Sequence, residues 1–234
     1  MTTTSQARAK PVKTLRRDQV EHAIYLDFEG NVDSAPSLLG VLVDDELVQY
    51  VVEPAMWAMQ HDGPGGPIAL TLEDALADVV RRYGEDRTVL AYTWHDRTVI
   101  DDFAEPTTTL RWHGRFVNAK LVADRWVNSG RAVALPTWAP DGTLASYLRL
   151  IGYRVPPAQG RNVAGPGLRR VRRGLERTHG DPTALTSGTK RHWTRVLGHN
   201  RHDLVGLRAL MRHAALDTDQ EVHRSWVATA ASDA

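Results

Sequence analysis

The fold begins with HAIYLDFEG at residues 22–30, a short apolar segment with β-branched and aromatic side chains that ends at a glycine. This pattern is typical of a β-strand. Alternate side chains of a strand point to the same face, so Asp27 and Glu29 project side by side. Leu26 and Phe28 point to the opposite face, toward a core. The sequence therefore predicts a first strand that carries two neighbouring carboxylates.

Four more segments have the composition of strands. PSLLGVLVDD at 36–45 and LVQYVVEP at 47–54 are joined by a tight turn at 44–46, and RTVLAYTW at 87–94 is predicted to be buried and parallel to the first strand. RFVNAK at 115–120 is a candidate fifth strand. Three strands in a row predict an antiparallel meander, and a meander that continues into βα units forms a mixed sheet. We therefore expect an α/β fold with a ribonuclease H-like mixed sheet flanked by helices, although other α/β folds share this order.

Helical patterns lie between and after the later strands. Apolar side chains recur every three or four residues in these segments: 72–83, 95–104, 143–151 and 188–214. The first of them starts at a capping box formed by Thr71 and Asp74, and the last is predicted to bend at Gly198. Within 160–182, where glycine and arginine are frequent, the pattern supports only a short helix.

The composition of the 234-residue chain is that of a globular protein, with 42% hydrophobic and 24% charged residues. The absence of cysteine excludes disulfides, thiolate zinc sites and a cysteine nucleophile. No apolar run approaches about 20 residues, and the N-terminal segment lacks the apolar core of a signal peptide. We therefore expect a cytoplasmic protein without membrane contact, with a flexible basic arm at 1–19, one domain at 20–216 and a tail at 217–234.

Charge is distributed unevenly along the chain. Residues 18–110 carry nineteen acidic and four basic side chains, whereas residues 161–215 carry twelve basic and three acidic ones. These parts suit the binding of cations and of an anionic polymer, respectively; the alternative is that they only attract each other. No lysine or arginine lies within 18–80, so no sequence neighbour neutralises Asp27 and Glu29. Like charges this close raise a pKa or require a cation, and Mg²⁺ or Mn²⁺ prefers carboxylate ligands.

Two more acidic side chains are candidates for the same site. Asp96 follows the strand at 87–94 and begins a helix, so it lies beside Asp27 if the two strands are neighbours. His199 and Asp203 are four residues apart and share one helix face. Such a pair can supply one metal ligand and one general base. Four other residues compete for these roles: Asp101, Asp102, His95 and His202.

Three motifs resemble those of the DEDD exonucleases in the ribonuclease H-like superfamily: YLDFEG at 25–30, AYTWHD at 91–96 and HNRHD at 199–203. The similarity is closest to a bacterial branch of predicted nucleases that are often joined to or near RecB-type nucleases and helicases. The chain departs from the family pattern at His199, which occupies the usual position of a tyrosine. It also departs at Asn118, where some relatives have an acid.

The resemblance implies a nuclease that hydrolyses phosphodiester bonds with two Mg²⁺ or Mn²⁺ ions. It implies four metal ligands, Asp27, Glu29, Asp96 and Asp203, and His199 as the group that orients or deprotonates water. It also implies 3′–5′ exonuclease action on single-stranded ends, with DNA favoured over RNA, and a helicase or nuclease partner. Two alternatives stay open: an endonuclease on the same scaffold, and a nucleic-acid-binding or assembly module with a weakened metal site.

The basic part of the chain supplies candidate contacts to substrate. Its densest segment, GLRRVRRG, contributes four candidates for phosphate binding: Arg169, Arg170, Arg172 and Arg173. Arginine neutralises phosphate without reading sequence. Trp94 is a candidate for stacking on an unpaired base, and Asn200, in the third motif, is a candidate substrate contact. The alternative for the arginines is a solvated helix face.

Overall fold

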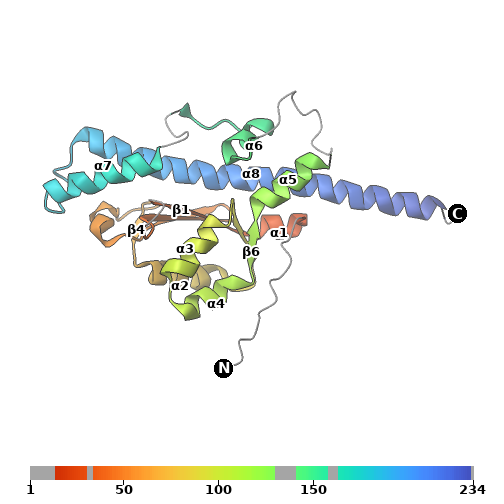
Figure 1. Cartoon of the computed structure of the whole chain (residues 1–234), viewed down its shortest axis with the longest axis horizontal. Coiled ribbons are helices and arrows are strands. Elements are labelled where there is room, and N and C mark those ends of the chain that lie inside the picture. Colours follow the sequence, from red (N-terminus) through yellow and green to blue (C-terminus); the bar gives the residue numbers. More distant parts are fainter. Residues whose placement is uncertain (1–13, 31–33, 130–140, 158–162, 233–234) are drawn as a thin grey trace.

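A six-stranded mixed sheet forms the centre of the protein (Figure 1). The structure is a computed structural model that describes residues 14–30, 34–129, 141–157 and 163–232. The strands are β1 (Ile24–Glu29), β2 (Leu38–Val43), β3 (Glu46–Val51), β4 (Ile68–Ala69), β5 (Val89–Ala91) and β6 (Phe116–Asn118). Their order is β4-β3-β2-β1-β5-β6; β1, β2 and β3 form an antiparallel meander, and β5 and β6 extend it in parallel. The predicted α/β fold with a mixed sheet is confirmed.

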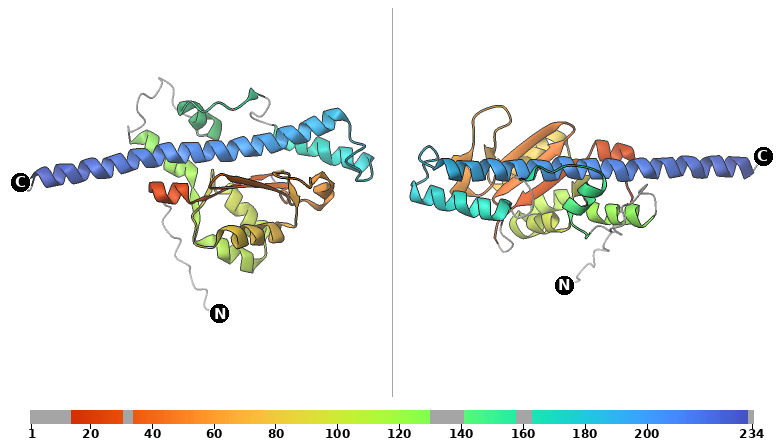
Figure 2. Two further views of the ribbon diagram at one scale, coloured as in Figure 1. Left: turned by 180° about the vertical axis from the view of Figure 1, so that it is seen from behind. Right: turned by 90° about the horizontal axis from the view of Figure 1, so that it is seen from above.

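Helices cover both faces of the sheet (Figure 2). They are α1 (Arg17–Glu21), the 3-10 helix η1 (Pro54–Met59), α2 (Leu72–Tyr83), α3 (His95–Phe103), α4 (Pro106–His113), α5 (Ala119–Asn128), α6 (Leu144–Leu150), α7 (Ala164–Arg177) and α8 (Ser187–Ser232). On one face, Leu26 and Phe28 of β1 pack with apolar residues of α2, α3 and α4. On the other face, Tyr25 packs with residues of α1, α5, α6 and α8. Because side chains alternate along a strand, Asp27 and Glu29 point to the face covered by α8.

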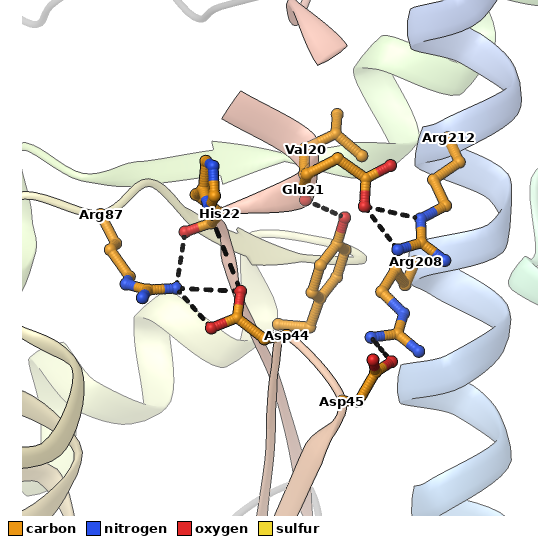
Figure 3. A network of polar contacts seen from close by, with 9 residues as sticks. Val20, Glu21, His22, Asp44, Asp45, Arg87, Arg208 and Arg212 are labelled. Carbon is orange, nitrogen blue, oxygen red and sulfur yellow. Dashed lines mark hydrogen bonds and ion pairs between the residues drawn. The ribbon is translucent and has the colours of Figure 1, made fainter. Parts of the chain in front are cut away.

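Ion pairs connect α8 to residues at the end of the sheet that contains the β2–β3 turn (Figure 3). Arg212 of α8 donates to the Glu21 carboxylate of α1, and Arg208 lies 3.3 Å from Asp45 in the β2–β3 turn. The adjacent Asp44 has a left-handed φ of 52°, which agrees with the tight turn predicted there. These contacts add to the apolar packing that joins α8 to α1 and the sheet.

The structure adds detail at both predicted ends of the domain. The arm predicted at 1–19 overlaps α1, and Leu15 is only 2% exposed because it packs in the core beneath α8. The tail predicted at 217–234 is helical to Ser232, since α8 runs without a break from Ser187 through Gly198. The part of the predicted arm from Leu15 onward therefore packs with the domain, while the predictions for residues 1–13 lie outside the described residues. Within the described part of the chain, no helix has the length and apolar content needed to cross a membrane.

Helix α7 is 14 residues long where only a short helix was expected. Its glycines explain the difference. A Cβ on Gly167 would lie 2.5 Å from Val196 Cγ2 of α8, and one on Gly174 would lie 2.8 Å from Leu185 Cδ2. The residues that weaken the helical pattern in the sequence thus allow α7 and α8 to pack closely. The elements η1, β4, α4 and α5 were also not expected.

Gly167→Ala is expected to lower the free energy of unfolding by about 1–3 kcal/mol, because the added methyl group overpacks the contact with Val196. Gly188→Ala in α8 is the control, since a Cβ there meets only Thr186 Oγ1 at 3.8 Å. The control should leave the stability unchanged or raise it by up to about 1 kcal/mol through better helix propensity. Urea denaturation followed by circular dichroism measures both, and equal effects would contradict the packing role of Gly167.

Candidate active site

Asp27 belongs to a row of residues that crosses three strands. It pairs in register with Gly40 of β2, and Gly40 pairs with Gln49 of β3. Residues paired across neighbouring strands lie on one face of the sheet, so the row faces α8. Because Gly40 has no side chain, a side chain of α8 can occupy the space between Asp27 and Gln49.

Asn200 of α8 fills this space and connects the two side chains. Its amide nitrogen donates to Asp27 Oδ2 at 2.8 Å and to the Asp27 carbonyl oxygen at 3.2 Å. Its amide oxygen accepts from Gln49 Nε2 at 2.8 Å, and Gln49 also donates to the Leu197 carbonyl oxygen at 3.0 Å. Asn200 is completely buried, which leaves no surface for the predicted contact with substrate. Its amide instead fixes the orientation of the Asp27 carboxylate.

Gly40 and Gln49 are site residues that the sequence analysis missed. A Cβ on Gly40 would overlap the Asn200 amide, so glycine at this position lets Asn200 reach Asp27. Gln49 is 7% exposed and lies among the apolar residues of β3 that follow Glu46. Both positions carried a usable signal, because a glycine inside a strand marks the close approach of another group and a buried amide needs a partner.

A second part of the site joins β1 to α8 directly. His199 Nε2 lies 3.8 Å from Glu29 Oε1 and 3.7 Å from Asp203 Oδ2. Ligand atoms of these three residues all lie within 4.8 Å of one another. Glu29 Oε1 is buried and has no hydrogen-bond partner. The pair predicted four residues apart on one helix face therefore does meet Glu29.

Asp96 completes the acidic group from the start of α3. It is 5% exposed, and its Oδ1 accepts a hydrogen bond at 3.1 Å from the backbone N–H of Phe28, the residue between Asp27 and Glu29. Asp101, a competing candidate, lies instead 3.4 Å from Arg97. The charges of Asp96 and Asp203 both act on Asp27 and Glu29, so the four carboxylates form one acidic group at the end of β1.

Burial and mutual repulsion raise the pKa values of these acids. Burial is the largest cause for Asp27, whose pKa lies well above its ordinary value, and the charges of Glu29, Asp203 and Asp96 add to the shift. Burial likewise raises the pKa of Glu29 well above its ordinary value. It also raises the pKa of Asp203 and lifts that of Asp96 to about 6. At neutral pH the group therefore favours either protons or a compensating cation.

The two other candidate histidines, His202 and His95, and Asn118 have contacts that differ from those of the acidic group. His202 Nδ1 lies 3.0 Å from the Tyr153 hydroxyl, and His95 is exposed. Asn118 is the N-cap of α5, where its Oδ1 accepts from the Leu121 N–H at 3.1 Å. Its role in this structure is therefore to begin a helix.

The predicted phosphate-binding arginines separate into two kinds. Arg172 donates to both oxygens of Glu53 at 2.6 and 2.7 Å, so it ties α7 to the residues after β3 and differs from the predicted phosphate contact. The side chains of Arg169, Arg170 and Arg173 are exposed, and their role stays a prediction. The predicted stacking residue Trp94 is 37% exposed, with the Arg97 guanidinium 5.6 Å from its ring centre.

The metal-free protein is expected to lose stability as the pH rises from about 4 to about 6. Raised pKa values mean that the folded chain binds protons more tightly than the unfolded chain between the ordinary value near 4 and the folded value, about 6 for Asp96. Stability therefore falls as the pH rises through this interval. Asp27→Asn should flatten the decline, whereas Asp86→Asn, an exposed acid before β5, should not. Urea denaturation in EDTA at several pH values measures this, and parallel curves for both variants would refute it.

Gly40→Ala is expected to lower the free energy of unfolding by about 1–3 kcal/mol, because the methyl group displaces the Asn200 amide and leaves buried partners unpaired. Asn200→Ala removes the colliding amide, so the same substitution should cost less in that background. A double-mutant cycle should give a coupling energy of at least about 1 kcal/mol. A coupling energy near zero would mean that the two residues do not interact in solution.

No protein-family model, no curated protein and no solved structure matches the chain. The acidic group and the residues around it are therefore the basis on which a function is inferred.

Proposed function

We propose that the protein is a metal-dependent nuclease that hydrolyses phosphodiester bonds of single-stranded nucleic acid. The observation that carries this proposal is the convergence of four largely buried carboxylates from β1, α3 and α8. Crowding of this kind destabilises a folded chain unless a cation compensates it, and it is characteristic of catalytic sites. A sheet in which a meander continues into βα units supports the ribonuclease H-like assignment that the motifs indicate.

The donor set fits divalent cations that prefer oxygen ligands. Four carboxylates balance the charge of two Mg²⁺ or Mn²⁺ ions, and Glu29 Oε1 is a buried acceptor in need of a partner. We assign the ligands to these residues: Asp27, Glu29, Asp96 and Asp203. When bound, two such ions activate water and stabilise the charge that develops on the leaving oxygen.

The chain itself supplies orientation and proton transfer. Asn200 holds Oδ2 of Asp27, and the Phe28 N–H holds Oδ1 of Asp96, so both carboxylates are fixed before substrate arrives. His199, beside Glu29 and Asp203, is the candidate acceptor for the proton of the attacking water. A tyrosine has this position in the exonucleases that the motifs resemble.

The mode of cleavage and the partner are part of the proposal and follow from the family resemblance. We infer 3′–5′ exonuclease action on DNA in preference to RNA, together with a RecB-type helicase or nuclease as partner. A nucleic-acid-binding module with weakened metal binding is the second candidate, because His199 stands where those exonucleases have tyrosine.

The protein is expected to shorten 5′-labelled single-stranded DNA stepwise in Mg²⁺ or Mn²⁺, and EDTA should stop the reaction. Asp27→Asn and Glu29→Gln should each lower the rate by more than about 100-fold. Replacing a residue that only hydrogen-bonds to a metal ligand already lowers metal affinity or activity by about 10- to 100-fold. The control Asp86→Asn should keep the rate of the parent. Mn²⁺ should also raise the melting temperature of the parent more than that of Asp27→Asn.

Product lengths distinguish the candidate functions. A ladder of successively shorter products supports the exonuclease, and internal fragments would support an endonuclease instead. Equal Mn²⁺-induced shifts in melting temperature for parent and Asp27→Asn, together with no hydrolysis, would overturn the nuclease proposal in favour of the binding module.

A further inference from the structure

A row of charged residues along α8 leads into the acidic group. Arg191, Arg195, His199 and Asp203 follow one another at intervals of four residues, so each lies next to the following one on the helix surface. With a rise of 1.5 Å per residue, Arg195 lies about 6 Å and Arg191 about 12 Å along the helix axis from His199. The first two of these side chains are exposed. The row therefore changes from cationic to acidic at the edge of the proposed active site.

Helix α7 places a third cation, Arg170, beside this row. The close packing of α7 on α8 at Gly167 places the two helices side by side (Figures 1 and 2). Arg170 Nη1 of α7 lies 3.0 Å from His192 Nε2 of α8. Burial, followed by the charges of Arg170, Arg195 and Arg191, lowers the pKa of His192. One guanidinium group thus contacts this imidazole, and the charges of the other two act on it.

These arginines differ in their partners from three other arginines of α7 and α8. Arg172, Arg208 and Arg212 each pair with a carboxylate. Among the described residues, no carboxylate lies within ion-pair distance of Arg170, Arg191 or Arg195. Three cations that repel one another and lack an acidic partner favour an anionic ligand.

We propose that Arg170, Arg191 and Arg195 bind backbone phosphates of the single strand whose adjoining phosphodiester lies at the acidic group. This inference rests on the proposed function and assigns the path of its substrate along α7 and α8. It also revises the basic segment predicted from the sequence, because Arg172 is removed from the contacts and two residues of α8 are added. Phosphate contacts of this kind position a strand without reading its sequence.

The test measures binding separately from hydrolysis. Fluorescence anisotropy with a labelled oligothymidylate in EDTA gives the dissociation constant of the Asp27→Asn protein at three salt concentrations. Adding Arg170→Gln and Arg195→Gln should make the salt slope shallower by about 1.4, or 0.7 for each lost contact, and raise the dissociation constant roughly 25-fold at 0.1 M salt. Arg170→Lys with Arg195→Lys, which keeps the charge, should retain most of the slope.

The matched control removes the same charge from the opposite face of the sheet. Arg81 of α2 and Arg111 of α4 are 72% and 60% exposed, and replacing both with glutamine should change the dissociation constant less than about threefold. Equal losses for the two double variants would overturn the inference, as would an unchanged slope for Arg170→Gln with Arg195→Gln. An Asp27→Asn protein that binds no oligonucleotide would also overturn it. In each of these cases, the metal-dependent hydrolysis assay decides the proposed function independently.

Discussion

The repulsion among four carboxylates at the end of β1 is the constraint to which the rest of the site responds. Asp27 and Glu29 are brought together by strand geometry alone, since they are two residues apart on one face. Asp96 of α3 and Asp203 of α8 lie near this pair. Their charges disfavour the ionised forms of Asp27 and Glu29 further. Two apolar clusters, one on each face of the sheet, contain residues of β1 and stabilise its position against this repulsion.

In the proposed metal site, Asn200 contacts Asp27 through a neutral amide, whereas a cationic side chain there would compete with the metal. A lysine or arginine beside Asp27 would neutralise the carboxylate and weaken its attraction for Mg²⁺ or Mn²⁺. An amide donates hydrogen bonds without adding charge, so it orients the carboxylate and leaves its charge available. Gln49 completes the arrangement by satisfying the amide oxygen of Asn200. Gly40 contributes only the absence of a side chain.

Local patterns in the sequence were enough to predict β1, its two carboxylates and the helix that begins near Asp96, because the alternation of strands and the periodicity of helices are properties of neighbouring residues. The role of Gly40 depends on the register of β2 against β1 and on a helix that follows much later in the chain, which no local pattern contains. The ion pair of Arg172 was missed for a related reason. Its partner Glu53 is 119 residues away, and charge density does not reveal partners at that separation.

Helix α8 connects the parts of the site because one rigid element carries several of them. Asn200 orients Asp27, His199 and Asp203 approach Glu29, and the exposed arginines lie one and two turns earlier on the same helix. A shift of α8 along its axis would move all of these groups together relative to β1, so their mutual spacing would be preserved while their distance to Asp27 changed. The contact of Arg208 with Asp45 in the β2–β3 turn and the contact of Arg212 with Glu21 in α1 oppose such a shift. The position of α8 on the meander therefore determines both the geometry of the acidic group and the proposed path of the nucleic-acid strand.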